Sequence, residues 1–193
     1  AQELFDLWQC VNYRFYVGNA NHADGKGIVV ANAKSLLRNI LDSAAEAIQE
    51  GGIAATLRFG HDGNVIPLVA LMRIEKCNVA VSDPYEVYKV WSDFKVVPMA
   101  GNVQIIFFRN EKSGDILVKV MHNENEVHIP VETDMFPYYK WEDVERFYRN
   151  LLNFYASCMR SGFRFCLFRR TMLCPRTAGY ARLTRRRAGA ILF

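Results

Sequence analysis

Two ionisable side chains are adjacent in the first half of the chain, between two glycines. His61 and Asp62 are preceded by Gly60 and followed by Gly63, and residues 53–59 in front of them are apolar and partly β-branched. A histidine can hydrogen-bond a phosphate oxygen, and a protonated aspartic acid can deliver a proton to a leaving oxygen. The glycines let the backbone turn sharply and approach a ligand closely. The pair could therefore lie over an anion site, or it could simply satisfy backbone groups of the turn.

The residues on either side of this pair predict a strand that leads into a helix. Residues 53–59 are bounded by glycines and have the composition of a buried central strand of an α/β sheet. Asn64 is expected to cap a helix that runs to about Arg73, with Pro67 in its first turn. Ligands of open α/β sheets bind beyond the carboxyl ends of strands, and helix N-termini attract anions. We therefore expect an anion site at this turn.

Residues 57–64, Leu-Arg-Phe-Gly-His-Asp-Gly-Asn, resemble the second signature of the histidine acid phosphatases. The similar branch of that family includes the phytases and the multiple inositol polyphosphate phosphatases. The resemblance extends from about Leu4 to about Arg149, and its other matching segments are residues 36–41, 97–102 and 137–141. It implies an α/β fold, with part of a Rossmann-like core sheet and flanking helices. It also implies a phosphomonoester hydrolase, plausible substrates being inositol phosphates, that works through a phosphohistidine intermediate.

The resemblance also assigns roles to individual residues. Asp62 would protonate the leaving alkoxide, and His61 would hydrogen-bond the phosphate. Arg58 and Asn64 are further candidates for substrate binding. A role as helix N-cap would by itself explain an asparagine at position 64. Arg58 either points into the same pocket or is a strand arginine that is paired on the surface. The resemblance implies no metal and no other cofactor, and it implies a periplasmic or secreted enzyme with a small phosphomonoester as its partner.

The family's first signature, Arg-His-Gly-x-Arg-x-Pro, does not occur in this sequence. That signature carries the nucleophilic histidine and the phosphate-binding arginines. The four histidines are His22, His61, His122 and His128, and none of them follows an arginine or precedes a glycine. We therefore expect the chain to be the C-terminal part of a longer enzyme, and to be inactive alone.

Composition divides the 193 residues into two parts. Residues 151–193 contain nine arginines and no Lys, Asp, Glu or His, which leaves 15 basic and 20 acidic residues before position 151. We therefore assign residues 1–150 to the phosphatase domain and residues 151–193 to an arginine- and cysteine-rich tail. A hydrophobic content of 51% is enough for one sizeable core. No segment resembles a membrane span, and residues 1–10 do not resemble a signal peptide.

Three interpretations of the tail remain open. It could be sequence that is read out of frame or disordered, which accounts best for arginine without lysine or acid. It could extend the helix that begins at Trp141. It could instead be an arm that makes the chain a non-catalytic module for anions, nucleic acid or membranes, since residues 185–187 are three arginines. Under the leading interpretation no nucleic acid partner is expected, and the oligomeric state is left open.

Hydrophobic periodicity predicts the remaining elements. Helices are expected at residues 3–15, 33–50 and 140–153, and an antiparallel hairpin at residues 101–109 and 115–121, with residues 126–131 returning beside it.

Four other reactive side chains have structural interpretations. Cys77 is expected to be structural and His22 to be a solvated loop residue. His122 and His128 are expected on an edge strand, without a metal.

Overall fold

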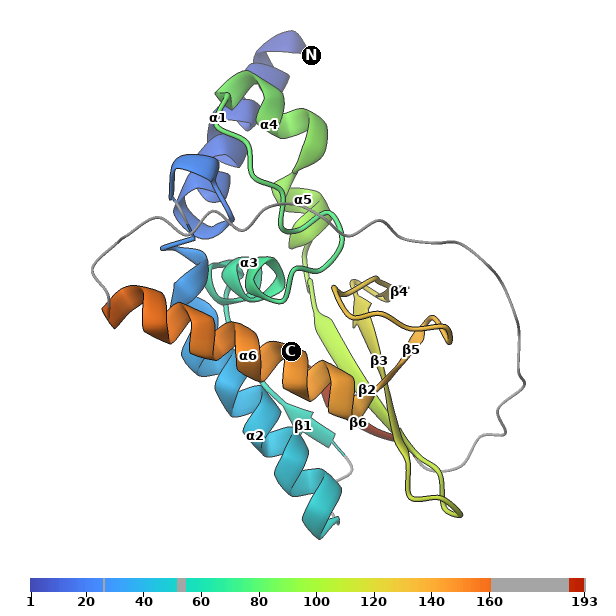
Figure 1. The fold of residues 1–193 in the computed structure, drawn as a ribbon. Coiled ribbons are helices and arrows are strands. Elements are labelled where there is room, and N and C mark those ends of the chain that lie inside the picture. Colours follow the sequence, from blue (N-terminus) through green and yellow to red (C-terminus); the bar gives the residue numbers. More distant parts are fainter. Residues whose placement is uncertain (26, 52–54, 161–187, 193) are drawn as a thin grey trace.

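The computed structural model describes residues 1–25, 27–51, 55–160 and 188–192 of the chain (Figure 1). Its α-helices are α1 (Gln2–Asn19), α2 (Lys34–Glu50), α3 (Asp62–Leu71), α4 (Pro84–Val90), α5 (Asp93–Val96) and α6 (Trp141–Arg160). Two short 3-10 helices, η1 (Ala23–Gly25) and η2 (Val30–Ala33), connect α1 to α2.

The described strands form one open, mixed sheet. They are β1 (Ala55–Leu57), β2 (Val103–Arg109), β3 (Ile116–His122), β4 (Asn125–Glu126), β5 (Tyr138–Lys140) and β6 (Ala188–Leu192). The order across the sheet is β1-β6-β2-β3-β4, and β5 also pairs with β3. β1 and β6 are parallel, and every other described pair is antiparallel. The α/β fold with flanking helices that the sequence predicts is therefore confirmed.

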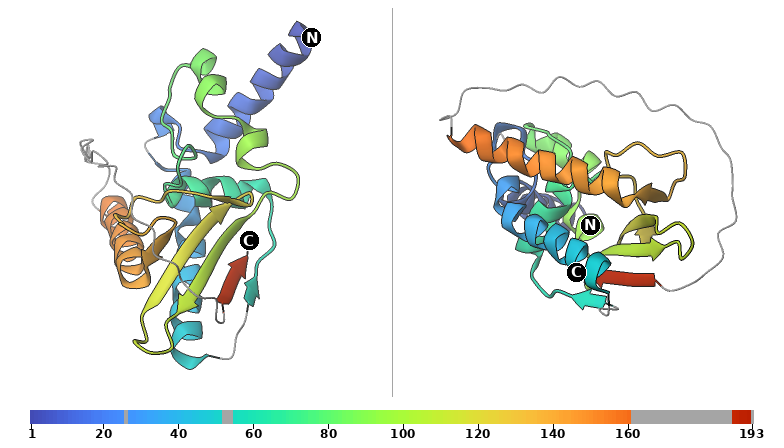
Figure 2. Two further views of the ribbon diagram at one scale, coloured as in Figure 1. Left: turned by 90° about the vertical axis from the view of Figure 1, so that its right-hand side faces the viewer. Right: turned by 60° about the horizontal axis from the view of Figure 1, so that its bottom comes forward.

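The predicted hairpin is present in β2 and β3. Their register runs from Val103 opposite His122 to Arg109 opposite Ile116. Alternate side chains of the two strands are buried, as the pleat of a half-covered sheet requires. The helices α2 and α6 cover the buried face, and the opposite face of β2 and β3 has no helix over it (Figure 2).

The predicted helix at residues 33–50 is present as α2. Its buried face consists of Leu37, Ile40, Leu41 and Ala44. The helix ends at Gly51, whose φ of 70° is a conformation that glycine adopts without strain. Arg149 of α6 binds Asp42 of α2 at 2.9 Å, so the two helices that cover the sheet are also joined at their polar edges.

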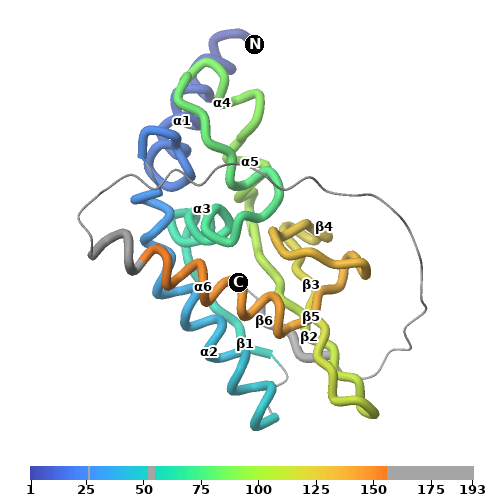
Figure 3. Tube along the Cα trace, viewed as in Figure 1, coloured from blue at the N-terminus to red at the C-terminus, as the bar shows by residue number. Residues whose placement is uncertain are grey.

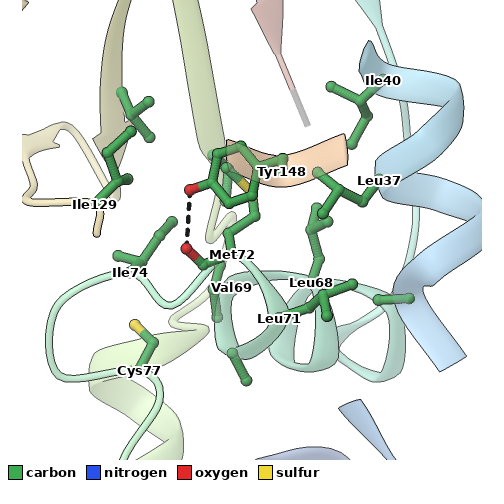
Figure 4. Close-up of a cluster of buried hydrophobic side chains, with 14 of the residues drawn as sticks. Leu37, Ile40, Leu68, Val69, Leu71, Met72, Ile74, Cys77, Ile129 and Tyr148 are labelled. Carbon is green, nitrogen blue, oxygen red and sulfur yellow. Dashed lines mark hydrogen bonds between the residues drawn. The ribbon is translucent and has the colours of Figure 1, made fainter. Parts of the chain in front are cut away.

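The core lies between α3, α2, α6 and the sheet (Figure 4). α3 contributes six consecutive buried residues, from Ile66 to Leu71, because it is apolar on all sides. The hydroxyl of Tyr148 on α6 donates a hydrogen bond to the carbonyl of Met72 at 2.8 Å. This contact fixes the C-terminal end of α3 beneath α6.

The prediction of a buried central strand at residues 53–59 is wrong for the residues that the structure describes. β1 is an edge strand with an exposed–intermediate–exposed pattern, and Leu57 is 54% exposed. Phe59, just after the strand, is 93% exposed. An apolar run does not distinguish a central strand from an edge strand, because that depends on which elements pack against it.

α1, α4 and α5 form a separate helical layer above the core (Figures 1 and 3). α1 and α4 lie side by side although more than sixty residues separate them in sequence. Phe5 contacts Tyr88 edge-on, and Trp8 contacts Phe94. The Trp8 indole also donates a hydrogen bond to Asp93 at 3.0 Å.

The compositional boundary at residue 150 falls inside α6, which continues without a break to Arg160. The tail also supplies β6, which lies between β1 and β2 in the sheet. Residues 161–187, which hold eight of the nine tail arginines, lie outside the described residues. The competing interpretations of this part of the tail therefore stay predictions.

Candidate active site

The His61–Asp62 pair lies at the N-terminus of α3, as the strand-to-helix prediction requires. His61 is the N-cap, with extended backbone angles of −104° and 169°, and Asp62 is the first helical residue. Both side chains are exposed. Because the second half of the helix is fully buried, the exposed first turn is attached to a rigid element.

Asn64 has a different position from the one that its sequence context predicts. It is the third residue of α3 and not the N-cap, and its side-chain oxygen accepts a hydrogen bond from the His61 backbone N–H at 3.2 Å. This is the reciprocal half of a capping box, in which a residue inside the first turn caps the backbone before it. The N-cap is therefore three residues earlier than predicted. Pro67 lies in the second turn, where its ring nitrogen cannot donate to the Gly63 carbonyl.

Gly60 makes room for this contact. A Cβ atom added at Gly60 would lie 3.2 Å from Asn64 Oδ1 and 3.4 Å from Asn64 Cβ. A larger residue at position 60 would push the Asn64 amide away from the His61 N–H. The turn of residues 60–64 is thus fixed by one glycine and one amide, which set the direction in which His61 enters the helix.

The Asp62 carboxylate accepts a hydrogen bond from the Gly63 N–H at 2.7 Å. The Asn64 N–H donates to the His61 carbonyl, so both N–H groups are already bound, and what the start of α3 offers an anion is the positive end of the helix dipole. His61 adds an exposed imidazole and Asp62 an exposed carboxyl group at the same place. The arrangement can hold an anion at the helix terminus and present a proton donor beside it.

Arg58 is positioned by α2. Its Nη2 donates to Asn39 Oδ1 at 2.8 Å and to Ser43 Oγ at 2.8 Å. The side chain is partly buried, and this burial lowers the pKa of the guanidinium group. Of the two sequence-based alternatives for Arg58, these contacts favour a paired strand arginine.

Asn39 and Ser43 were not identified from sequence as residues of this region. They lie one turn apart on α2, and Arg58 follows them by 19 and 15 residues. Their types are common on helix surfaces, so no local pattern marks them. Only the packing of β1 against α2 brings them to Arg58.

The second histidine region is buried and lies at the end of β3. His122 is 7% exposed, and its Nε2–H donates to the Val96 carbonyl at 2.8 Å. Its Nδ1 is then the acceptor and lies 3.7 Å from the Cys77 sulfur. Burial lowers the pKa of His122, and the hydrogen bond to Val96 opposes this effect. Burial also raises the pKa of Cys77 to about 12, consistent with a structural role for that thiol.

The predicted edge-strand position of His122 is therefore wrong, because β3 pairs with β2, β4 and β5. His128 is exposed and stacks on Phe136 with ring centroids 3.9 Å apart. The prediction for His22 is also wrong. Its side chain is only 10% exposed, since its ring lies against Tyr13 and Tyr16 of α1.

Two further findings limit what the described residues can do. Within the described part of the chain, no three His, Cys, Asp or Glu side chains gather as a metal site would require. No helix in that same part is both long and apolar enough to cross a membrane. A small void between α2, α6 and the sheet is lined by apolar side chains and aromatic rings, so it has no groups suited to a phosphate.

No protein-family model and no curated protein matches this chain. Three solved structures of the multiple inositol polyphosphate phosphatase of Bifidobacterium longum are similar in fold. The apo form has 24% identity over 65% of this chain and 28% of that one, with a TM-score of 0.52. The complex with phosphate has 21% identity over 77% and 30%, with a TM-score of 0.55. The complex with inositol hexasulfate has 24% identity over 75% and 29%, with a TM-score of 0.54.

The chain spans less than a third of the length of these phosphatase structures. At this level of identity the similarity concerns the fold. The α/β fold of this chain thus resembles part of the multiple inositol polyphosphate phosphatase of Bifidobacterium longum.

Proposed function

We propose that this chain carries the proton-donor portion of a histidine acid phosphatase site that acts on phosphomonoesters. The observation that carries the proposal is the exposed His61–Asp62 pair at the start of a buried helix, directly after β1. The similarity in fold to a multiple inositol polyphosphate phosphatase supports the same assignment. Asp62 is the proposed general acid, and His61 is the proposed phosphate-binding residue.

In the proposed reaction, the nitrogen of a histidine from the first signature attacks phosphorus. A P–N bond forms and the P–O bond to the alcohol breaks, while the Asp62 carboxylic acid gives its proton to the leaving oxygen. Water then attacks the phosphohistidine and gives a proton to the Asp62 carboxylate, while a P–O bond forms and the P–N bond breaks, so that phosphate is released and the histidine and the aspartic acid are restored. The nucleophile of the first step is absent from these 193 residues.

The proposed substrates are inositol phosphates. The start of α3 is open to solvent, so a bulky polyanion can reach the positive end of the helix dipole and the His61 ring. Arg58, which donates to Asn39 and Ser43 of α2, places a basic group near the same strand end. One of the similar structures is a complex of that phosphatase with inositol hexasulfate, an analogue with comparable charge. For the native protein we propose a periplasmic or secreted location.

A direct test uses the 193-residue chain and a phosphomonoester at mildly acid pH. No sustained release of phosphate is expected, because a general acid cannot replace the missing nucleophile. Sustained turnover would show that the nucleophile, or the whole assignment, is wrong.

A binding measurement tests the proposed anion site without requiring turnover. Calorimetric titration of the same chain with inositol hexasulfate should show weak binding that decreases when His61 is replaced by alanine. The matched control is His128→Ala, which removes an exposed histidine on another element. Equal affinities of the two variants and the parent chain would contradict the proposed role of His61.

A further inference from the structure

α1 has a row of exposed apolar side chains along one face. Leu4 is 73% exposed, Leu7 65% and Val11 48%. Their spacing of three and four residues places them on the same side of the helix. We call these three residues the outer stripe of α1. Asn12 and Tyr16 lie on a different face and are buried, so among the described residues it is that face, and not the outer stripe, that packs against the rest of the chain.

α1 packs against the described part of the molecule through its inner side, which carries Phe5, Trp8 and Asn12. Phe5 and Trp8 contact the aromatic rings of α4 and α5, and Asn12 donates to the Trp91 carbonyl at 3.2 Å. The steps of three and then four residues that define the outer stripe continue at Arg14 and at the exposed Gly18. Such a three–four repeat is the seam by which two helices pack against each other. α1 has 18 residues and is therefore about 27 Å long, enough for such a seam.

The charges beside the outer stripe select an antiparallel partner. Glu3 and Asp6 lie near the start of α1, and Arg14 lies near its end. In an antiparallel pair, Glu3 of one copy lies beside Arg14 of the second copy, and Leu7 packs against Val11 of the second copy. A parallel pair would place each charge against the same charge. The stripe is thus complementary to itself through a two-fold axis, as symmetric dimers require.

We propose that the outer stripe of α1 is the interface of a homodimer, in which two α1 helices pack antiparallel around a two-fold axis midway between Leu7 and Val11. Cys10 is exposed and lies beside the stripe close to this axis, so the two Cys10 thiols come near each other. Stable interfaces bury about 800 Å² per partner. Because the stripe contributes only three side chains, the dimer is weak and depends on concentration.

Sedimentation equilibrium of the intact chain over a range of concentrations tests this proposal. The parent chain should show a reversible monomer–dimer equilibrium, and Leu7→Glu should weaken it by roughly a hundredfold, since each dimer loses two buried leucines and gains two buried charges. The matched control is Leu57→Glu, which replaces a comparably exposed leucine on β1, far from α1. A parent chain that is monomeric at every concentration would overturn the proposal, as would a dimer unaffected by Leu7→Glu.

The charge arrangement and the thiol supply two independent measurements. Arg14→Glu should weaken the dimer by about three- to tenfold, and the additional change Glu3→Arg should restore it. Failure of this double variant to recover would contradict the antiparallel orientation. In a variant with serine at positions 158, 166 and 174, a short bismaleimide should link two chains through Cys10, and Cys10→Ser should abolish the link. Equal crosslinking with and without Cys10 would exclude this axis.

Discussion

The start of α3 and the end of β3 each bring a histidine next to a second reactive side chain, but in opposite environments. His61 and Asp62 are exposed at a helix terminus, where solvent and anions can reach them. His122 and Cys77 are buried, and the imidazole is occupied by a backbone carbonyl. The comparison shows that residue types alone do not make a site. Access and protonation state decide which pair can react.

The burial of His122 and Cys77 has a clear structural role. His122 and Asn123 both donate to the Val96 carbonyl at the end of α5, at 2.8 Å and 3.1 Å. These bonds satisfy an acceptor that a helix end otherwise leaves without a partner. They also attach the helical layer of α1, α4 and α5 to the sheet. The α3 terminus makes no comparable link through His61 or Asp62, whose side chains extend into solvent.

The largest effect is expected from Asp62→Asn in a version of the chain extended to include the first signature. Turnover should fall by roughly 10²–10⁴-fold, because the leaving oxygen then receives no proton from the enzyme. Substrate affinity should change little. Steady-state kinetics measure both quantities, with the exposed loop residue Asp134→Asn as the control. Turnover equal to that of the parent would remove Asp62 from the mechanism.

The next largest effect is expected in the reactivity of two thiols, Cys10 and Cys77. A pKa of about 12 for Cys77, against about 8.5 for a reference thiol, lowers its thiolate fraction at neutral pH by roughly 10³. Cys10 is exposed and should be labelled by a maleimide much faster than Cys77. Peptide mass spectrometry of the folded and the denatured chain distinguishes the two residues. Rapid labelling of Cys77 in the folded chain would show that its environment is open.

The buried histidine should make the protein sensitive to acid. Because burial lowers the pKa of His122 in the folded state, the unfolded state binds the proton more readily. The free energy of unfolding should therefore decrease as the pH falls through about 6.5, the reference value, and level off below the folded-state pKa. The neighbouring groups are the Cys77 thiol, which accepts no proton in this range, and Glu75, which acts on Cys77.

Urea unfolding at several pH values measures this dependence. His122→Gln should reduce the slope of stability against pH, because glutamine can still donate to the Val96 carbonyl but does not titrate. The control is His128→Gln, since His128 is exposed and stacked on Phe136. If the slope is the same in the parent and in His122→Gln, the acid sensitivity has another origin.

The smallest effect is expected from the turn that holds His61. Asn64→Ala removes the acceptor for the His61 N–H and should lower the free energy of unfolding by about 1 kcal/mol. It should also weaken the binding of inositol hexasulfate, because the direction of His61 is no longer fixed. Asn32→Ala, at an exposed position of η2, is the control for stability. Unchanged binding and stability would mean that the turn holds its shape without this amide.

Much of the fold follows from local patterns. The apolar spacing of α2 and the alternation in β2 and β3 each correspond to one conformation whose period matches the sequence. β5 and β6 were not predicted. They are short, and their strand geometry depends on pairing with β3, and with β1 and β2, rather than on their own composition.

The sequence by itself determined the site motif, the turn that carries it, and the absence of the first signature from these 193 residues. A helix start next to glycines is a local event, so nearby residues predict that a helix begins there, although the N-cap is His61 and not the predicted Asn64. Only the tertiary structure decided that β1 is an edge strand, that Arg58 binds α2, and that His122 is buried. Each of these depends on contacts between residues many positions apart, and burial is a property of the packed core and not of a residue type.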